Sequence, residues 1–316
     1  MSKNISFAGL FFASISILLW GITFVSTKYL LRSFSPYEIL LIRFFMAYLA
    51  LWVSKPKKIR LYERKHEIYF MLAGLSGVTA YQFMENMAIS YTSASNVSVI
   101  VSICPMFTAI FLQLFLKEKH LTPFFNIGFL FAIVGVALVS FNGVVNFHLN
   151  PKGDFLALLA AVSWGFYSLC IVKINALGFE TVVVTRRIFF WAVIFMLPIG
   201  IFSLLTQGAS LPSEMGNISL ILDPAFNLSR IKNPLNWLNM GFLGLGASAF
   251  CFAAWSIACK KLGTVRATVG IYLIPVVTII FAFFALGEKI SLMGATGAVL
   301  TIAGLFVSEI KSIHNS

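Results

Sequence analysis

Residues 103–119, "ICPMFTAIFLQLFLKEK", and residues 273–289, "LIPVVTIIFAFFALGEK", are two copies of one pattern. In each copy a proline precedes a long apolar run that closes on Glu-Lys, and the two copies align at a constant offset of 170 residues. Apolar runs of this length are typical of helices that cross a membrane, whereas the strands of outer-membrane barrels alternate apolar and polar residues. The pattern therefore predicts membrane-spanning helices and an internal repeat.

The composition of the whole chain supports a multi-span membrane protein. Of the 316 residues 59% are hydrophobic and only 11% are charged, and the mean hydropathy is +0.92, which excludes an ordinary soluble domain. A helix needs about 20 apolar residues to cross the hydrocarbon core of a bilayer. On this criterion the sequence predicts ten spans, at 7–31, 36–54, 67–91, 94–116, 122–142, 154–174, 179–205, 235–259, 265–286 and 291–309.

A second alignment extends the repeat toward the amino terminus. At an offset of 144 residues, "LLWGITFVSTKYLL" matches "VSWGFYSLCIVKIN", so that Trp20 aligns with Trp164 and Arg43 with Arg187. The change of offset from 144 to 170 locates an insertion at about 206–234, a polar stretch that contains Pro and Gly. The predicted domains are therefore 1–144, with five helices, and 145–316, with five helices and the insertion.

Five is an odd number, so the second copy must enter the membrane with the opposite orientation. Inverted repeats of this kind are the architecture of alternating-access transporters. A gene duplication in a channel or a membrane enzyme is the alternative. We expect no enzyme, because the sequence shows no HExxH motif, no paired aspartates and no histidine within a predicted span.

The distribution of Lys and Arg predicts the orientation, since short cytoplasmic loops are enriched in both. With a cytoplasmic amino terminus, fourteen fall on the inner side: Lys3, Lys55, Lys57, Lys58, Arg60, Arg64, Lys65, Lys117, Lys119, Lys173, Lys260, Lys261, Arg266 and Lys311. Five fall outside: Arg32, Lys152, Arg230, Lys232 and Lys289. Both termini are therefore expected in the cytoplasm, and the net charge of +12 indicates topology and attraction to anionic lipid, not nucleic-acid binding.

An acidic residue lies inside the third predicted span, in "YQFMENMAISY" (81–91). A charge at the centre of a membrane helix costs on the order of 2.5 to 3.5 kcal/mol, so Glu85 needs a polar cavity or a partner. Gln82, Glu85 and Asn86 are spaced i, i+3 and i+4, and Tyr81 lies one turn before Glu85. All four residues share one helix face, which we expect to line a cavity.

Arg43 is the expected counter-charge of Glu85. Counted at about 1.5 Å per residue, Glu85 lies roughly 9 Å and Arg43 roughly 10 Å below the outer boundary. We therefore expect the two side chains to be close, as a direct pair or bridged through substrate or water. A permanent ion pair that only orients the helices and a pair that engages substrate or proton both remain open.

Further candidates come from the repeat and from aromatic residues within the spans. The second-half position that corresponds to Glu85 is Trp255, so the symmetry breaks where a ligand would bind. Aromatic rings offer an apolar or cation-attracting wall, although packing or interfacial anchoring explains each ring equally well. Arg187, the repeat mate of Arg43, is a cavity candidate, whereas we expect Arg186 to reach the inner interface. The aromatic candidates are Trp20, Tyr81, Trp164, Tyr167, Trp255 and Tyr272.

The repeated features resemble the ten-span drug/metabolite transporter superfamily, and within it the EamA-type members. The residues that carry the resemblance are Trp20-Gly21, Trp164-Gly165, Arg43, Arg187, "YTSASNVSVI" from Tyr91, the two Pro-to-Glu stretches and the glycine-rich helices that follow them. The resemblance implies a bundle in which the first four helices of each repeat surround a central cavity, while the fifth helices pack outside. It also implies a metabolite transporter, with export of amino acids as the typical activity and with proton coupling or substrate exchange both open.

The candidate residues suit a zwitterion, because an arginine can hold a carboxylate and an acid or an aromatic face can hold an ammonium group. An amino acid or a derivative is therefore the expected substrate, moved by alternating access across the plasma membrane, which is the inner membrane in a bacterium. Nucleotide-type metabolites and a lipid or lipid-linked sugar flippase are the alternatives. We expect a monomer or homodimer without cofactor or metal, since the four cysteines show no metal-type spacing.

Overall fold

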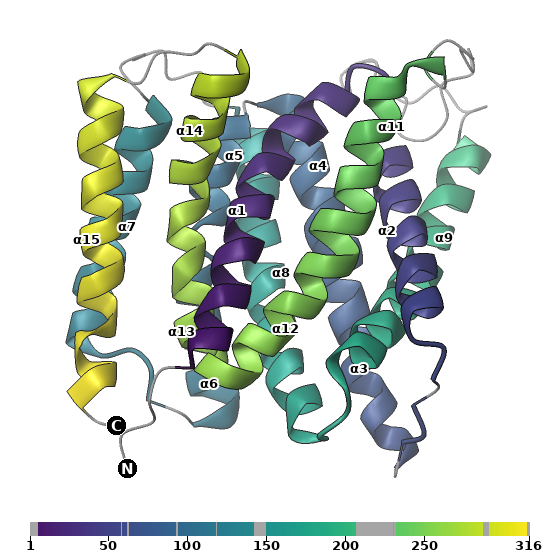
Figure 1. The fold of residues 1–316 in the computed structure, drawn as a ribbon, viewed down its shortest axis with the longest axis horizontal. Helices are drawn as coiled ribbons and strands as arrows, with labels where there is room; N and C mark the ends of the chain where they lie inside the picture. Colours follow the sequence, from purple (N-terminus) through teal and green to yellow (C-terminus); the bar gives the residue numbers. More distant parts are fainter. Residues whose placement is uncertain are drawn as a thin grey trace.

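The computed structural model of the chain describes residues 6–57, 59–61, 63–92, 94–117, 119–141, 150–206, 230, 232–286 and 291–314, and within these residues it contains helices and no strand (Figure 1). The all-helical fold expected from the apolar runs is thereby confirmed. The predicted insertion at 206–234 and the predicted domain boundary at 144/145 lie largely outside the described residues, as do Glu118 and Glu288.

The described residues form the following helices, in chain order. The first eight are α1 (Phe7–Leu30), α2 (Pro36–Ser54), α3 (Glu67–Ala73), α4 (Tyr81–Tyr91), α5 (Ala94–Val101), α6 (Cys104–Leu116), α7 (Pro123–Phe141) and α8 (Pro151–Ala176). They continue as α9 (Thr181–Thr206), α11 (Pro234–Gly241), α12 (Cys251–Leu262), α13 (Thr264–Val269), α14 (Ile274–Leu286) and α15 (Leu292–His314). The π-helical turns η2 (Gly74–Ala80) and η4 (Phe242–Phe250) and the 3-10 turns η1 (Arg64–His66) and η5 (Gly270–Leu273) join or precede helices.

Among the described residues, six helical stretches are long and apolar enough to cross a membrane. They are Phe7–Leu30, Pro36–Ser54, Val97–Leu116, Pro151–Ala176, Thr181–Ile199 and Pro234–Leu262. The chain is therefore a multi-span membrane protein, while the number of ten spans stays a prediction. The predicted fourth span, 94–116, is interrupted between α5 and α6 just before Pro105, where a proline cannot donate a backbone hydrogen bond.

Helix starts follow the local sequence. The Ser35 hydroxyl accepts from the Glu38 backbone N–H, and the Glu38 carboxylate accepts from the Ser35 N–H, a capping box that begins α2 at Pro36. Asn150 caps α8 and Asn233 caps α11, each one residue before a proline. The turns before these helices are thus fixed by residues next to them in sequence.

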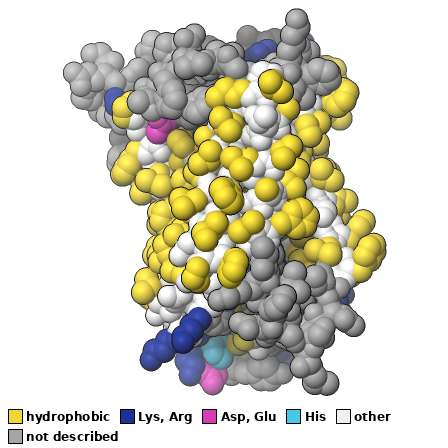
Figure 2. All heavy atoms as spheres, turned by 90° about the vertical axis from the view of Figure 1, so that its left-hand side faces the viewer, with side chains coloured by type: hydrophobic (Ala, Val, Ile, Leu, Met, Phe, Trp, Pro, Cys, Tyr) yellow, Lys and Arg dark blue, Asp and Glu magenta, His cyan; other side chains and the backbone are white. Residues whose placement is uncertain are grey.

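The outer surface between the helix ends is apolar. Figure 2 shows the face on which α7 and α15 lie, with hydrophobic side chains over its middle and Lys and Arg side chains near its ends. Exposed residues here include Leu130, Phe131, Val134, Val299 and Phe306. A surface of this kind fits the hydrocarbon core of a bilayer, with charges at the headgroups.

The glycines of α7 and α15 allow these two helices to touch along their backbones. A Cβ atom at Gly128 would lie 2.5 Å from the Gly304 carbonyl oxygen, and one at Gly135 would lie 2.4 Å from the Thr301 nitrogen. The sequence left open whether this packing lies within one chain or between two. It lies within the chain, and the α7–α15 pair forms one side of the molecule (Figure 1).

Candidate functional site

Aromatic rings fill the interior where helices from both parts of the chain meet. Trp164 is the centre of this packing, with its ring centroid 5.5 Å from that of Trp20, 5.0 Å from Tyr81 and 4.9 Å from Tyr167. We define the central aromatic cluster as Trp20, Phe44, Tyr81, Trp164, Tyr167, Phe189, Phe252 and Trp255, all of them buried. Five of the six predicted aromatic candidates are therefore together and packed on one another.

The two tryptophans aligned by the repeat differ in their hydrogen bonds. Trp20 Nε1 donates to the Ala247 carbonyl oxygen in η4 at 3.0 Å. The π-helical turn η2 corresponds to η4 in the repeat alignment. In η2 the Ser76 carbonyl oxygen accepts from the Ser163 hydroxyl at 2.8 Å. Trp164 Nε1 is buried and has no hydrogen-bond partner among the described residues. Buried donors in this condition are rare, and they mark places where a polar group of a ligand or water fits.

A polar network lies beside the cluster. The Arg43 guanidinium donates to Gln82 Oε1 at 2.9 Å and to Ser248 Oγ at 3.0 Å, and only 2% of the arginine is exposed. The Tyr81 hydroxyl donates to Glu85 Oε1 at 3.3 Å. No direct ion pair joins Arg43 and Glu85 in the described part of the chain, although the positive charge of Arg43 acts on the Glu85 carboxylate. Gln82 and Ser248 are thus the hydrogen-bond partners of Arg43, and a bridge to Glu85 through substrate or water stays a prediction.

Asn86 continues this face of α4 toward the start of α2. Its Nδ2 donates to the Pro36 carbonyl oxygen at 3.2 Å, while its Oδ1 is buried and has no partner among the described residues. The acceptor Asn86 Oδ1 and the donor Trp164 Nε1 are thus both buried and unpartnered among the described residues. Arg43 and Glu85 are buried as well.

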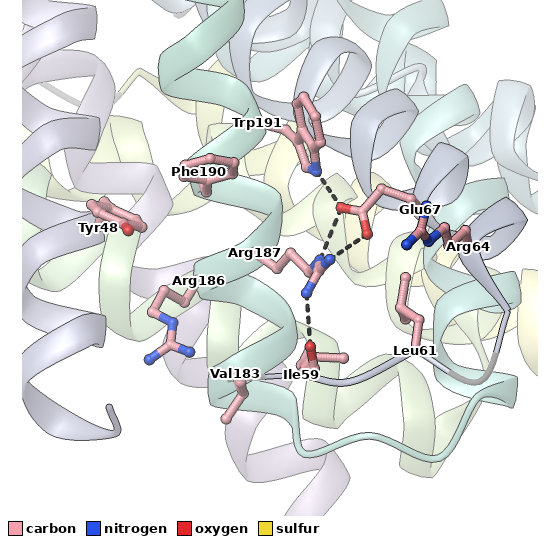
Figure 3. A pocket seen from close by; sticks show the side chains of 10 residues that line it. All are labelled: Tyr48, Ile59, Leu61, Arg64, Glu67, Val183, Arg186, Arg187, Phe190 and Trp191. Carbon is pink, nitrogen blue, oxygen red and sulfur yellow. Dashed lines mark hydrogen bonds and ion pairs between the residues drawn. The ribbon is translucent and has the colours of Figure 1, made fainter. Parts of the chain in front are cut away.

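Two predicted residues lie away from the central aromatic cluster. Tyr272 packs in a separate apolar group with Ala109, Phe125 and Ala132, and its ring centroid is 6.4 Å from that of Phe129. Arg187 faces a pocket of about 720 Å³ at the end of the molecule where α3 begins (Figure 3). Arg187 therefore pairs with Glu67, while the buried Tyr272 hydroxyl has no hydrogen-bond partner among the described residues.

We name this second location the α3–α9 pocket. It is lined by Tyr48, Ile59, Leu61, Arg64, Glu67, Val183, Arg186, Arg187, Phe190 and Trp191. Arg187 Nε donates to Glu67 Oε1 at 2.9 Å, and its Nη2 pairs with the other carboxylate oxygen (Figure 3). Arg187 Nη1 donates to the Ile59 carbonyl oxygen at 3.0 Å, and Trp191 Nε1 donates to Glu67. These bonds fasten the segment before α3 to α9.

Arg186 and Lys55 add further contacts between α9 and the segment that follows α2. Arg186 donates to the carbonyl oxygens of Lys55 and Lys57, so it reaches the connection after α2 while its neighbour Arg187 faces the pocket. Lys55 pairs with Glu180, just before α9. Arg186 and Arg187 both line the α3–α9 pocket but have different partners, backbone carbonyls for Arg186 and the Glu67 carboxylate for Arg187.

A second ion pair closes the opposite end, where α2 and α11 begin. Arg230 Nη2 donates to Glu38 Oε1 at 2.9 Å and Arg230 Nη1 to Glu38 Oε2 at 3.2 Å. Arg230 also donates to the Ser33 carbonyl oxygen, and its backbone oxygen accepts from Asn236. The side chains are 8% and 9% exposed, so this bidentate pair is buried.

Several residues of these sites were not singled out by sequence. Ser248 is a lone hydroxyl in a run of Gly and Ala, two helical turns before Trp255, and this spacing is the one signal that could have identified it. Phe252 contacts Trp20, Trp164 and Phe189, but the chain has 33 phenylalanines and nothing in the sequence separates this one from the rest. Glu67 and Glu38 lie at the boundaries of predicted spans, where acidic residues are common and do not by themselves indicate a site.

The predicted site residues offer charged groups, amides and aromatic rings as possible contacts. Among the described residues no group of three His, Cys, Asp or Glu side chains is placed to hold a metal ion. All four cysteines are buried free thiols, as their positions in the predicted spans indicate. Paired opposite charges, amides and rings can instead bind a small molecule that carries both charges.

Comparison with known proteins identifies relatives over nearly the whole chain. Residues 7–141 and 151–309 match the EamA-like transporter family. A protein of Archaeoglobus fulgidus named "Uncharacterized transporter" is 25% identical and covers 94% of this chain and 96% of its own. The "Probable amino-acid metabolite efflux pump" of Salmonella typhimurium is 27% identical, with 94% and 93% covered. A solved crystal structure shares the fold at a TM-score of 0.71, with 18% identity and 98% and 97% covered.

Proposed function

This chain belongs to the EamA-like transporter family, and from that premise we propose that it moves an amino acid or a close derivative across the plasma membrane by alternating access. The proposal includes export as the direction, which the name of the Salmonella typhimurium relative supports. It also includes Glu85 as the acid that meets either the ammonium group of the substrate or a coupled proton. The substrate site of the proposal is the polar network at the central aromatic cluster.

One observation carries the choice of a zwitterion. Six buried polar atoms have no hydrogen-bond partner among the described residues, and two of them, the donor Trp164 Nε1 and the acceptor Asn86 Oδ1, belong to predicted site residues that are buried together with Arg43 and Glu85. A substrate carboxylate would accept from the indole and the guanidinium, and a substrate ammonium group would donate to the amide and the carboxylate. The rings around Trp164 would then cover the side chain of the substrate.

Several features support two inverted five-helix repeats, 1–144 and 145–316, with ten spans. The family match falls into two ranges of similar length, 7–141 and 151–309. The π-helical turns η2 and η4 occupy matching positions, 168 to 170 residues apart. At one end of the molecule Glu38 in α2 pairs with Arg230, which precedes α11. At the other end Arg187 in α9 pairs with Glu67, the first residue of α3. Alternating access in this proposal opens one end while the other stays closed, with both termini in the cytoplasm.

Substitution of Trp164 tests the site directly. Trp164→Phe keeps a ring but removes the indole N–H, and Trp20→Phe makes the same change where the N–H already has a partner. In proteoliposomes loaded with labelled amino acids, we expect Trp164→Phe to raise the KM for counterflow about tenfold, the size expected for a lost hydrogen bond to a charged group. Its unfolding midpoint without substrate should fall less than that of Trp20→Phe, because both changes shrink a buried ring but only Trp20→Phe also leaves an acceptor unpaired.

Trp20→Phe should show the reverse pattern, with a lowered unfolding midpoint, because it leaves the Ala247 carbonyl unpaired, and with a smaller change in KM. A thermal-shift screen of the purified chain against amino acids, nucleotides and lipid-linked sugars identifies the substrate class, since a ligand that binds only the folded state stabilises it. Stabilisation by nucleotides but by no amino acid would reject the proposed substrate. Equal KM values for Trp164→Phe and wild type would reject the proposed site.

A further inference from the structure

We propose that the α3–α9 pocket binds the phosphate group of an anionic phospholipid, with Arg64 as its principal charged contact. The site lies apart from the central aromatic cluster, at the end of the molecule where α2 ends and α3 begins (Figure 3). It therefore concerns a ligand other than the transported substrate.

The charge of the lining is the first observation. Three arginines and one glutamate line the pocket. Glu67 neutralises Arg187, whereas the acceptors of Arg186 are backbone carbonyls, which leave its positive charge in place. Arg64 is exposed, and its side chain makes no hydrogen bond or ion pair with a residue that the structure describes. The lining thus carries two uncompensated positive charges, one of them with all its donors available.

The connection between α2 and α3 adds to this positive field. Residues 55–67 contain six Lys or Arg residues against two Glu. Lys65 pairs with Glu63, and this hydrogen bond lowers the pKa of the Glu63 carboxyl group, so both stay charged and offset each other. Arg64 lines the pocket and makes no such pair with a described residue, whereas Arg60 lies outside the lining. Basic clusters next to a membrane helix attract anionic headgroups by about 1 kcal/mol per Lys or Arg.

The second observation is an apolar wall that continues onto the membrane-facing surface. Tyr48 of α2 and Phe190 of α9 line the pocket with their ring centroids 6.3 Å apart, and Phe190 is 43% exposed. Phe45, Leu49 and Trp52 on α2 are exposed at 44% or more and follow one another at helical spacing. A soluble phosphate would use only the arginines, while a phospholipid would use this wall as well.

Both observations together select the ligand. An anion with apolar chains would place its phosphate against Arg64 and lay its acyl chains along Tyr48, Phe190 and the exposed face of α2, with the charge of Arg186 on the other side of the Arg187–Glu67 pair (Figure 3). The pocket lies at helix ends, which is the depth of the headgroups in a bilayer. A lipid here would also sit beside the Arg187–Glu67 pair, which joins α9 to α3.

Lipid titration of the purified full-length chain tests the proposal. We expect phosphatidylglycerol, added to the protein in a neutral detergent, to raise the unfolding midpoint and to stay bound in native mass spectrometry. Phosphatidylcholine, inorganic phosphate and glycerol phosphate should do neither. Arg64→Gln should weaken phosphatidylglycerol binding about fivefold, the effect of one arginine at a headgroup. Its midpoint without lipid should equal that of the wild type, because Arg64 has no partner to lose.

Arg60→Gln is the matched control, since it removes the same charge from the same exposed connection outside the pocket lining. It should change lipid binding by less than about twofold. Arg64→Lys, which keeps the charge, should retain most of the binding. Equal losses in Arg64→Gln and Arg60→Gln would overturn the proposal in favour of a diffuse surface attraction. Equal stabilisation by glycerol phosphate would overturn it in favour of a soluble-anion site, and no preference over phosphatidylcholine would overturn it outright.

Discussion

The Glu38–Arg230 pair and the Glu67–Arg187 pair close opposite ends of the molecule in the same manner but in different surroundings. Glu38 lies in the first two turns of α2 and pairs with Arg230, which precedes α11. Arg187 lies in the first two turns of α9 and pairs with Glu67, the first residue of α3. The charges are exchanged, because the acid stands on α2 in one pair and the arginine stands on α9 in the other. The first pair is 8% and 9% exposed, and the second is 30% and 20% exposed beside a pocket.

This difference predicts which end separates more readily. A buried ion pair that loses one partner leaves a charge without solvent, whereas a half-exposed pair can exchange its partner for water. Glu67 also has a second donor in Trp191, and Arg187 a second acceptor in Ile59. Glu38 and Arg230 likewise have further partners in the Ser35 N–H and the Ser33 carbonyl oxygen, so the two ends differ in the burial of the ion pair and not in the number of its contacts.

Glu38→Gln should have the largest effect. The change leaves the Arg230 guanidinium buried beside a neutral amide, which costs about 3 to 5 kcal/mol for a buried pair. We expect a corresponding fall in the free energy of unfolding of the detergent-purified chain, measured by chemical denaturation.

The double variant Glu38→Gln, Arg230→Met separates charge from shape. Removal of both charges should recover at least half of the loss, because no uncompensated charge remains. A double variant as unstable as Glu38→Gln would show that the pair is not the source of the stability of this end.

Glu67→Gln should have an intermediate effect. The amide keeps an acceptor for Arg187 or Trp191, and the pair is partly solvated, so we expect a loss of about 1 to 2 kcal/mol. The loss should shrink in 0.5 M salt, since screening acts more strongly on exposed pairs. A loss as large as that of Glu38→Gln, or one that salt leaves unchanged, would remove the contrast between the two ends.

Glu180→Gln should have the smallest effect. Glu180 and Lys55 are 47% and 35% exposed, and exposed ion pairs contribute about 0 to 1 kcal/mol. We expect the free energy of unfolding to change by less than about 0.5 kcal/mol. A change that exceeds the effect of Glu67→Gln would mean that Lys55, not Glu67, is the main fastening between α9 and the segment before α3.

Periodicity and charge predicted much of the candidate site. The i, i+3, i+4 pattern of Gln82, Glu85 and Asn86 required one helix face, and all three residues are buried on α4. The depth of Arg43 in its predicted span placed it level with this face, and in the structure the Arg43 guanidinium donates to Gln82 Oε1. The prediction could not decide between a direct and a bridged contact with Glu85, because one helical turn separates Gln82 from Glu85 and side-chain length decides which one the guanidinium reaches.

The repeat alignment was less informative for Arg187. It placed Arg187 at the position of Arg43, but Arg187 bonds to Glu67 at the α3 end while Arg43 bonds to Gln82 and Ser248 in the interior. The amino acids around equivalent backbone positions differ after duplication, so the same side chain finds another partner. For the same reason Trp20 has an acceptor and Trp164 has none.

The sequence alone determined the properties that depend on neighbours along the chain: apolar helices of membrane-spanning length, capped starts such as Ser35–Glu38, and the polar face around Glu85. Only the tertiary structure decided which residues meet across helices: Ser248 with Arg43, Arg230 with Glu38, Phe252 with Trp164, and the basic pocket around Arg64. The physical reason is range, because helix formation and insertion depend on residues within a few turns. Pairing across the bundle depends on helix rotation and depth, which no local pattern specifies.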